Sequence, residues 1–263
     1  MAKFVAKQPT SNLSLQGIGI LANPANVSFS NRDSDGFIAQ SQTVRLEIGG
    51  EDFRYFGGRP KATGTITDIK YYASGTLYYK ITKMQIDLHD IASTSNLEKV
   101  TNDIFSTDDI VKGSFGNDTL AGFKGKDRID GKAGADNLQG DGGKDTLIGG
   151  DGADILNGGK GKDIYVFKSA SITGVDTITK FQDGEILQFK STKFDGLTKG
   201  ALSPDQFVIG TDAADADDRF IYDTNAGRLY HDPDGVGGVA KALVAIMQPK
   251  LDDVLGADSI FVI

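Results

Sequence analysis

The sequence predicts an all-β protein built around a parallel β-roll, with a small antiparallel β domain before the roll and a β-rich cap after it. Three observations predict it: a nine-residue repeat rich in glycine and aspartate, alternating apolar segments before that repeat, and short apolar segments separated by turn residues after it. A chain of 263 residues can hold more than one core. We place the antiparallel domain at 1–95, a linker with a degenerate capping repeat at 96–112, the roll at 113–166 and the cap at 167–263.

The repeat begins at Gly113, ends at Val166 and comprises six units of nine residues. The units read GSFGNDTLA, GFKGKDRID, GKAGADNLQ, GDGGKDTLI, GGDGADILN and GGKGKDIYV. Positions 1 and 4 are always glycine, position 6 is always aspartate, and position 8 is always large and apolar. A degenerate unit over residues 104–112 precedes them, because Asp109 and Val111 occupy its positions 6 and 8.

Each unit divides into six loop residues and three strand residues, so that two units make one coil. Successive strands then alternate between two sheets, and the position-8 side chains of both sheets meet in the core. Loops n and n+2 share one edge of the roll. The position-6 carboxylates therefore stack in the pairs Asp118 with Asp136, Asp136 with Asp154, Asp127 with Asp145, and Asp145 with Asp163.

The loops predict calcium sites. Glycine lets the backbone turn tightly and aim its carbonyl groups inward, and the short aspartate arm adds a carboxylate. A ligand set made only of oxygen suits Ca²⁺. The alternative, that these residues are only turn formers, leaves a period of nine with an invariant carboxylate unexplained. We expect about four Ca²⁺ ions between stacked loops, and a roll that is largely unfolded without them. The predicted ligand residues are Asp118, Asp127, Asp136, Asp145, Asp154, Asp163, Gly113, Gly116, Gly122, Gly125, Gly131, Gly134, Gly140, Gly143, Gly149, Gly152, Gly158 and Gly161.

Net charge, cysteine content and the distribution of apolar residues exclude several classes of function. A net charge of -8 disfavours nucleic acid as a partner and favours a cation. The absence of cysteine excludes a disulfide framework and a cysteine zinc site. No apolar stretch reaches the ~20 residues of a membrane helix. The first residues lack the apolar region of a signal peptide, so we expect no cleavable N-terminal signal.

The motif G-G-x-G-x-D-x-apolar-x resembles that of the repeats-in-toxin (RTX), or hemolysin-type, calcium-binding family, and the region from Asp109 to Ile263 is similar to the C-terminal half of serralysin-type proteases. The resemblance implies a calcium-loaded parallel β-roll, an uncleaved C-terminal signal, a type I exporter as partner and an extracellular location. Calcium scarcity in the cytosol would keep the chain unfolded until it is exported. Position 2 departs from the motif in the first four units, where Ser, Phe, Lys and Asp stand.

Lysines occur at loop positions 3 and 5 of the even units only: Lys124, Lys126, Lys144, Lys160 and Lys162. Because even units share an edge, that edge should carry a row of lysines. One interpretation is a solvated face that offsets the aspartate charge. The other is a docking strip for an anionic polysaccharide or a cell surface.

Before the repeats, 44–48 with 53–55 predicts one hairpin with Gly49-Gly50 as its turn, and 63–72 with 77–88 predicts a second. Tyrosine doublets at 71–72 and 78–79 place a ring on each face of that second hairpin, which suits a sugar platform or cross-strand packing. Capping-box spacing at 95–98 predicts a short helix.

We expect this domain to be non-catalytic and to bind a partner, by adhesion or by contact with surface polysaccharide. The alternative is a small secreted polysaccharide-active enzyme, a lyase, hydrolase or epimerase, with the same export module. No H-E-x-x-H or G-x-S-x-G motif occurs, and the two histidines, His89 and His231, lie in different modules. Asn31–Gly36 and Asp232–Gly235 are interpreted as turns rather than ion sites, although an ion at the second remains open.

Overall fold

The computed structural model describes residues 108–168, 174–250 and 255–263 with their side chains, and eight strand segments between 3 and 87 as backbone, together with the buried side chain of Ile48. Within these residues the chain is nearly all β, with short 3₁₀ turns as its only helices. No helix in this part of the chain has the length and apolar character that a membrane crossing requires. The expected helix at 95–98 and His89 lie outside the described residues.

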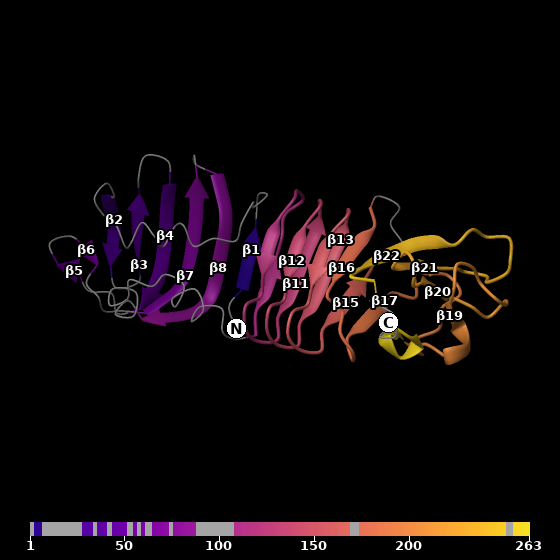
Figure 1. Cartoon of the computed structure of the whole chain (residues 1–263). Coiled ribbons are helices and arrows are strands. Elements are labelled where there is room, and N and C mark those ends of the chain that lie inside the picture. The colour runs from indigo at the N-terminus through magenta and orange to yellow at the C-terminus, as the bar shows by residue number, and fades with distance from the viewer. Residues whose placement is uncertain are drawn as a thin grey trace.

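The repeats form a parallel β-roll of two sheets, as the period of nine predicts (Figure 1). Even units supply one sheet, which starts from the degenerate unit, and its strands are β9 (Ile110–Lys112), β11 (Arg128–Ala133), β13 (Thr146–Asp151) and β15 (Ile164–Phe167). Odd units supply the other sheet, with β10 (Thr119–Ala121), β12 (Asn137–Gln139) and β14 (Ile155–Asn157). Pairing joins residues 18 apart, for example Thr119 with Asn137. Two units therefore make one coil.

The core of the roll is a double column of position-8 side chains. All are at most 1% exposed, and they are Val111, Leu120, Ile129, Leu138, Leu147, Leu156 and Tyr165. Each fully buried aliphatic side chain contributes roughly 1.5–3 kcal/mol. Since successive units alternate between the sheets, the two columns face each other across the interior and hold the sheets together.

Both columns continue beyond the six repeats. In the odd sheet β16 (Asp176–Thr179) pairs with β14, and β22 (Ala242–Gln248) pairs with β16. In the even sheet β17 (Ile186–Phe189) pairs with β15, and β23 (Ile260–Val262) pairs with β17. Residues 176–179 and 186–189 therefore continue the stack of the roll. The apolar segment at 260–263 packs as a strand, and the Ile263 carbonyl accepts the Ser191 N–H at 2.9 Å.

The cap beyond the roll is also β-rich. It contains β18 (Gly200–Ala201), the 3₁₀ turns η2 (Pro204–Gln206) and η3 (Ala257–Ser259), β19 (Phe207–Ile209), β20 (Phe220–Asp223) and β21 (Arg228–His231). Strands β20 and β21 form a hairpin, and the Asp223 carboxylate accepts the Asn225 N–H at 2.9 Å in its turn. Strand β21 pairs antiparallel with β22, which joins the cap to the odd sheet.

The N-terminal strands extend the even sheet (Figure 1). These are β1 (Lys3–Ala6), β2 (Ser28–Asp33), β3 (Gly36–Gln40), β4 (Val44–Glu51), β7 (Thr65–Ala73) and β8 (Thr76–Asp87), with a separate ribbon of β5 (Tyr55–Phe56) and β6 (Arg59–Pro60). Strand β1 pairs parallel with β9 and antiparallel with β8, and all further pairs are antiparallel. The prediction of antiparallel β structure before the roll is therefore confirmed.

One of the two predicted hairpins is wrong. Strands β7 and β8 pair around residues 73–76, as expected, with Tyr71 opposite Tyr79. Gly49-Gly50, in contrast, lies inside β4, where the register against β7 shifts between the two glycines. Two glycines can form either a tight turn or a β-bulge. Here β4 pairs with β3 on one side and with β7 on the other, so the chain continues as a strand and the glycines form a bulge.

The close approach of successive loops gives a test with a matched control. A Cβ on Gly143 would lie 1.5 Å from the Gly125 carbonyl oxygen, whereas a Cβ on its neighbour Gly142 meets nothing nearer than 3.6 Å. We expect Gly143→Ala to lower the free energy of unfolding of the calcium-loaded roll by roughly 2–3 kcal/mol, and Gly142→Ala to change it by less than about 1 kcal/mol. Urea unfolding followed by circular dichroism measures both. Equal effects of the two substitutions would contradict this loop stacking.

Candidate metal centre

The position-6 aspartates form two ladders, one on each edge of the roll. Each carboxylate precedes a strand, and the strand pairing brings residues 18 apart next to each other. The pairs expected from the sequence are all present. The six repeat aspartates are at most 2% exposed, and they are Asp118, Asp127, Asp136, Asp145, Asp154 and Asp163.

One oxygen of each carboxylate is used to join coils. Asp118 N–H donates to Asp136 Oδ1, Asp127 N–H to Asp145 Oδ1, and Asp145 N–H to Asp163 Oδ1, each at 2.8 Å. Asp136 N–H donates to Asp154 Oδ1 in the same way. Hydrogen bonds to a charged acceptor are stronger than neutral ones. The ladder is thus a backbone-to-carboxylate zipper along each edge.

The other oxygen is left over. Oδ2 of Asp127, Asp136, Asp145, Asp154 and Asp163 is buried and has no hydrogen-bond partner among the described residues. A buried charged oxygen without a partner is costly, and native structures contain few. Five such atoms at equivalent positions indicate a repeated site for a cation rather than five unrelated packing defects.

Each unpartnered oxygen points into a small cradle at a position-1 glycine. A Cβ on Gly131 would lie 2.3 Å from Asp136 Oδ2 and 2.7 Å from the Gly149 carbonyl oxygen. A Cβ on Gly140 would lie 2.5 Å from Asp145 Oδ2 and 2.4 Å from the Gly158 carbonyl oxygen. Glycine at position 1 therefore allows the carboxylate oxygen to approach the backbone, and at Gly131 and Gly140 it also allows a carbonyl oxygen of the next coil to lie beside that carboxylate oxygen.

Burial raises the pKa of these carboxyl groups. Desolvation is the main cause, and the neighbouring carboxylates of the same ladder add to it, so that the pKa of Asp127 rises to about 8 and those of Asp136 and Asp145 to about 7. Desolvation also raises the pKa of Asp154. The hydrogen bonds from backbone N–H groups act in the opposite direction. At neutral pH the ladder therefore favours either protons or a cation.

Position 2 explains the second glycine of the motif. Gly150 and Gly159 have φ of 113° and 95°, and three of the four non-glycine residues at this position keep a left-handed backbone, with φ of 70° at Phe123, 78° at Lys132 and 67° at Asp141. These three departures from the motif therefore carry strain while the backbone conformation is kept. At Ser114 the departure has a local effect, because its N–H and hydroxyl both donate to Asp118 Oδ2 at 2.6 and 3.0 Å.

Two ladder members were missed by the sequence analysis. Asp154 N–H donates to Asp176 Oδ1 at 3.1 Å, which makes Asp176 the next member of the odd ladder. In the even ladder Glu185 follows Asp163, since Ile186 N–H donates to the Asp163 carbonyl at 2.9 Å and Glu185 is fully buried. Desolvation raises the pKa of both groups to about 8. Gly174, Asp176 and Ile178 match positions 4, 6 and 8 of the repeat. The match is hidden in the sequence because four additional residues separate them from the preceding units.

The residues fit Ca²⁺. The donors are carboxylate and carbonyl oxygens only, which a hard cation with flexible geometry accepts. Among the described residues, no three side chains of His, Cys, Asp or Glu converge on one point, so backbone carbonyls must complete each site. The position-6 aspartates and the carbonyls of the loop glycines would hold the ions between loops n and n+2, which belong to successive coils.

Comparison with known proteins agrees with this geometry. The family model for the RTX calcium-binding nonapeptide repeat (4 copies) matches residues 104–138 and 131–165. Residues 104–165 are therefore RTX calcium-binding repeats. The match begins at the degenerate unit and covers the calcium-binding repeats, which supports Ca²⁺ as the bound metal.

Two further comparisons add little to the RTX assignment. The search of curated proteins gave no significant match. Among solved structures, the chain is similar to the solution structure of the AlgE6R3 subunit from the Azotobacter vinelandii mannuronan C5-epimerase, with 22% sequence identity, 59% of this chain and 78% of that chain covered, and a TM-score of 0.27.

The other candidate sites are turns where the structure describes them. Asp33 pairs with Gly36 at the end of the β2–β3 hairpin. Asp232 Oδ1 accepts the N–H groups of Asp234 and Gly235 at 3.2 and 2.9 Å, which closes a turn at the end of β21. His231 is buried against Phe194 and Phe220, and its Nε2 lies 3.0 Å from the Asp195 carbonyl oxygen. It packs the cap and belongs to no cluster of three potential metal-ligating side chains among the described residues.

Asp145 belongs to two pairs of the even ladder, which makes Asp145→Asn the most informative substitution. The amide keeps the shape but removes the charge from both cradles, so we expect fewer bound ions and at least about tenfold weaker calcium affinity, or ~1.4 kcal/mol. Isothermal titration and chelator competition measure this. Asp130→Asn is the control, because Asp130 pairs with Lys168 at 3.1 Å on the surface. Unchanged calcium binding in Asp145→Asn would exclude the ladder as the site.

Calcium affinity of the RTX roll should rise with pH. In the calcium-free fold the carboxyl pKa values of about 7 and 8 lie above the unfolded value near 3.9, so this fold retains protons and loses stability as pH rises from about 4 to 8. Calcium must displace those protons. We expect at least about tenfold tighter binding at pH 8 than at pH 6, with proton release detected by calorimetry in buffers of different ionisation enthalpy. Binding without proton release would contradict the burial of these groups.

Proposed function

We propose that this RTX protein is exported by a type I system and folds outside the cell when calcium enters its roll. The calcium has a structural role, with about four or more ions between the stacked loops. The N-terminal sheet is a non-catalytic binding module for adhesion or for surface polysaccharide.

The observation that carries the proposal is the set of buried, unpartnered Oδ2 atoms beside glycine cradles. Taking an ionised carboxylate out of water costs several kcal/mol, and five of them stacked along two edges add mutual repulsion. A divalent cation between loops removes both costs. Because the sites exist only when coils are stacked, the binding free energy of calcium is also folding free energy.

Calcium levels connect this folding to export. Sites of extracellular modules work at about 10⁻⁴ to 10⁻³ M calcium, far above cytosolic levels. The roll would therefore stay unfolded inside the cell and fold outside. The C-terminal segment supports this order, since Ile260 and Val262 are each 1% exposed in the folded chain and their strand is paired on both sides. An exporter can reach such a segment only before the roll has formed.

Calcium-coupled folding is tested directly on the full chain. We expect chelator to abolish the β signal of the roll in far-ultraviolet circular dichroism at neutral pH, and about millimolar calcium to restore it, whereas magnesium at the same concentration restores little because it demands rigid octahedral geometry. The N-terminal strands should still give a β signal in chelator, and this signal serves as the baseline for the change that comes from the roll. A circular dichroism spectrum that changes neither with chelator nor with calcium would refute the proposal.

A further inference from the structure

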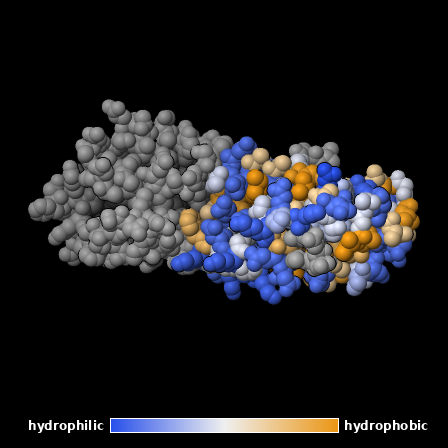
Figure 2. All heavy atoms as spheres, in the orientation of Figure 1, coloured by the Kyte–Doolittle hydropathy of each residue, from blue (hydrophilic) through white to orange (hydrophobic). Residues whose placement is uncertain are grey.

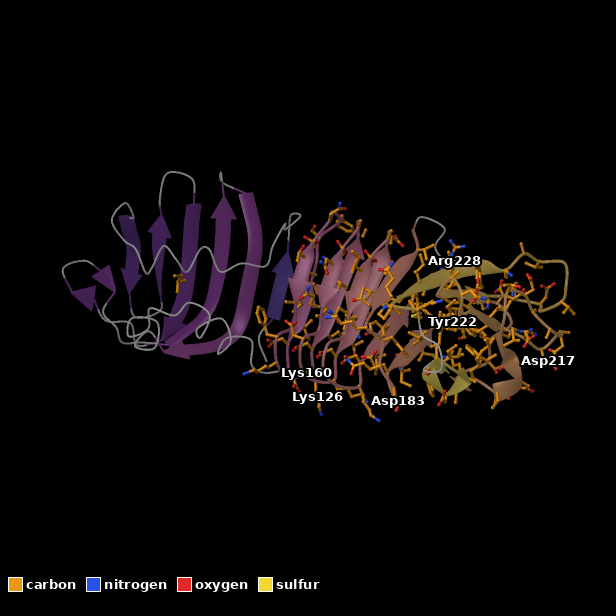
Figure 3. All side chains as sticks on the ribbon, in the orientation of Figure 1. Lys126, Lys160, Asp183, Asp217, Tyr222 and Arg228 are labelled. Carbon is orange, nitrogen blue, oxygen red and sulfur yellow. The ribbon has the colours of Figure 1, made fainter. Side chains whose placement is uncertain are left out.

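One edge of the roll carries five exposed lysines, which we call the lysine ridge: Lys124, Lys126, Lys144, Lys160 and Lys162. All five come from loops of the even units, between a strand of the odd sheet and the next strand of the even sheet. Lys126 and Lys160 lie along the same edge in Figure 3, and Figure 2 shows hydrophilic residues covering that edge. The single row of lysines predicted from the sequence is therefore present.

The ridge lysines stand in register. Parallel bridges join Lys124 to Gly142 and Gly142 to Lys160, so position 3 of three successive coils is aligned. Lys126, Lys144 and Lys162 fill position 5 of the same three coils, one strand spacing of ~4.8 Å apart. Like charges directly opposite each other on neighbouring strands are destabilising. The fold thus maintains a row of ammonium groups against their mutual repulsion.

No ridge lysine forms a hydrogen bond or ion pair through its ammonium group with any described residue. Other lysines do: Lys132 donates to the Gly113 carbonyl, Lys168 pairs with Asp130 at 3.1 Å, and Lys241 pairs with Asp212 at 2.5 Å. Lys132 is the informative contrast. It belongs to an odd unit, near the end of β11, and its ammonium group already donates to a carbonyl of the preceding coil. The even edge keeps its lysines available.

The charge beneath the ridge depends on calcium. Asp127, Asp145 and Asp163 are buried directly under these loops, and in the absence of cation their charges offset the lysines at short range. Divalent ions between the pairs cancel the carboxylates and leave the ridge net positive. The ridge thus becomes a site for anions when the roll is loaded, which rests on the proposed calcium-bound state.

The acidic residues around the lysine ridge favour one shape of anionic ligand over others. Exposed aspartates flank it at both ends: Asp108 accepts the Lys126 N–H at 2.8 Å one coil before, and Asp183 lies in the loop one coil after Lys162. The whole chain has a net charge of -8. A flat anionic membrane or a duplex would meet these acids and also Asp141, which is exposed at position 2 of the middle even loop, whereas a thin chain can follow the position-5 lysines Lys126, Lys144 and Lys162.

We propose that the lysine ridge binds a linear polyuronate, an acidic polysaccharide with one carboxylate on each sugar, laid along the axis of the roll. Each coil presents its ammonium groups to one stretch of the polymer, and the register of the coils sets the spacing. Binding and calcium loading reinforce each other, because a polyanion on the ridge relieves the repulsion that remains once calcium has cancelled the carboxylates.

The test uses the calcium-loaded full chain and short oligogalacturonates, which are too short to gel with calcium. Lys126→Gln, Lys144→Gln and Lys162→Gln are combined in one variant. We expect its affinity for the oligogalacturonate to fall by roughly tenfold, since three exposed charge contacts are lost. The control variant combines Lys190→Gln, Lys193→Gln and Lys199→Gln, which removes the same charge from exposed lysines of the cap and should bind as the unchanged protein does.

Three further measurements keep the outcomes distinct. Oligogalacturonate should tighten calcium binding in the unchanged protein and not in the ridge variant, while calcium-dependent folding itself persists in both, which separates this proposal from the proposed function. Equal loss of binding in the ridge and cap variants would overturn it, as would ridge-dependent binding to phosphatidylserine vesicles without binding to oligogalacturonate. Oligogalacturonate binding that survives in the ridge variant would assign the polysaccharide to the N-terminal sheet instead.

Discussion

The structure depends on one constraint: a row of buried carboxylates must find positive charge. The zipper of backbone N–H groups satisfies one oxygen of each aspartate and fixes the coil-to-coil register. The second oxygen faces a space that only glycine leaves open. The same residues therefore both build the edge of the roll and make it unstable without a cation. The metal ladders on the edges are as much a part of the core as the apolar columns between the sheets, and neither can form without the stacking that forms the other.

An invariant period made the roll and its aspartate pairs predictable from sequence. Each of the six units repeats the same loop and strand, so the fold of one coil determines the next. Asp176 and Glu185 escaped because the inserted residues between 167 and 176 break the period, and because a glutamate replaces the aspartate in the second case. The hairpin predicted around Gly49-Gly50 failed for a different reason. Two glycines permit a turn and a bulge equally, and only the strands that pair with β4 decide between them.

Strain at position 2 shows how strongly the stack controls each loop. Left-handed backbone costs a non-glycine residue roughly 1–2 kcal/mol, and yet Phe123, Lys132 and Asp141 adopt it. The loops on either side leave little freedom, because each packs against the carbonyls of the next coil at the closest distances that glycine allows. The period of the stack overrides local preference. Sequence departures at position 2 are therefore tolerated, whereas position 1 and position 4 remain glycine in all six units.

A stack of parallel strands has two open ends, and each end exposes strand edges that could pair with another chain. Strands of other origin cover both ends of the even sheet and the far end of the odd sheet, whereas β10 is the edge strand of the odd sheet among the described residues. At one end of the even sheet β1 pairs parallel with β9 and antiparallel with β8. At the other, β18 lies antiparallel to β23 in one sheet and β21 lies antiparallel to β22 in the other. The change from parallel to antiparallel pairing ends the repeat pattern in both directions in the even sheet and at the far end of the odd sheet. Cations between loops would join one coil to the next but could not pair the strand edge of a terminal coil, and the flanking strands supply that pairing at these three edges.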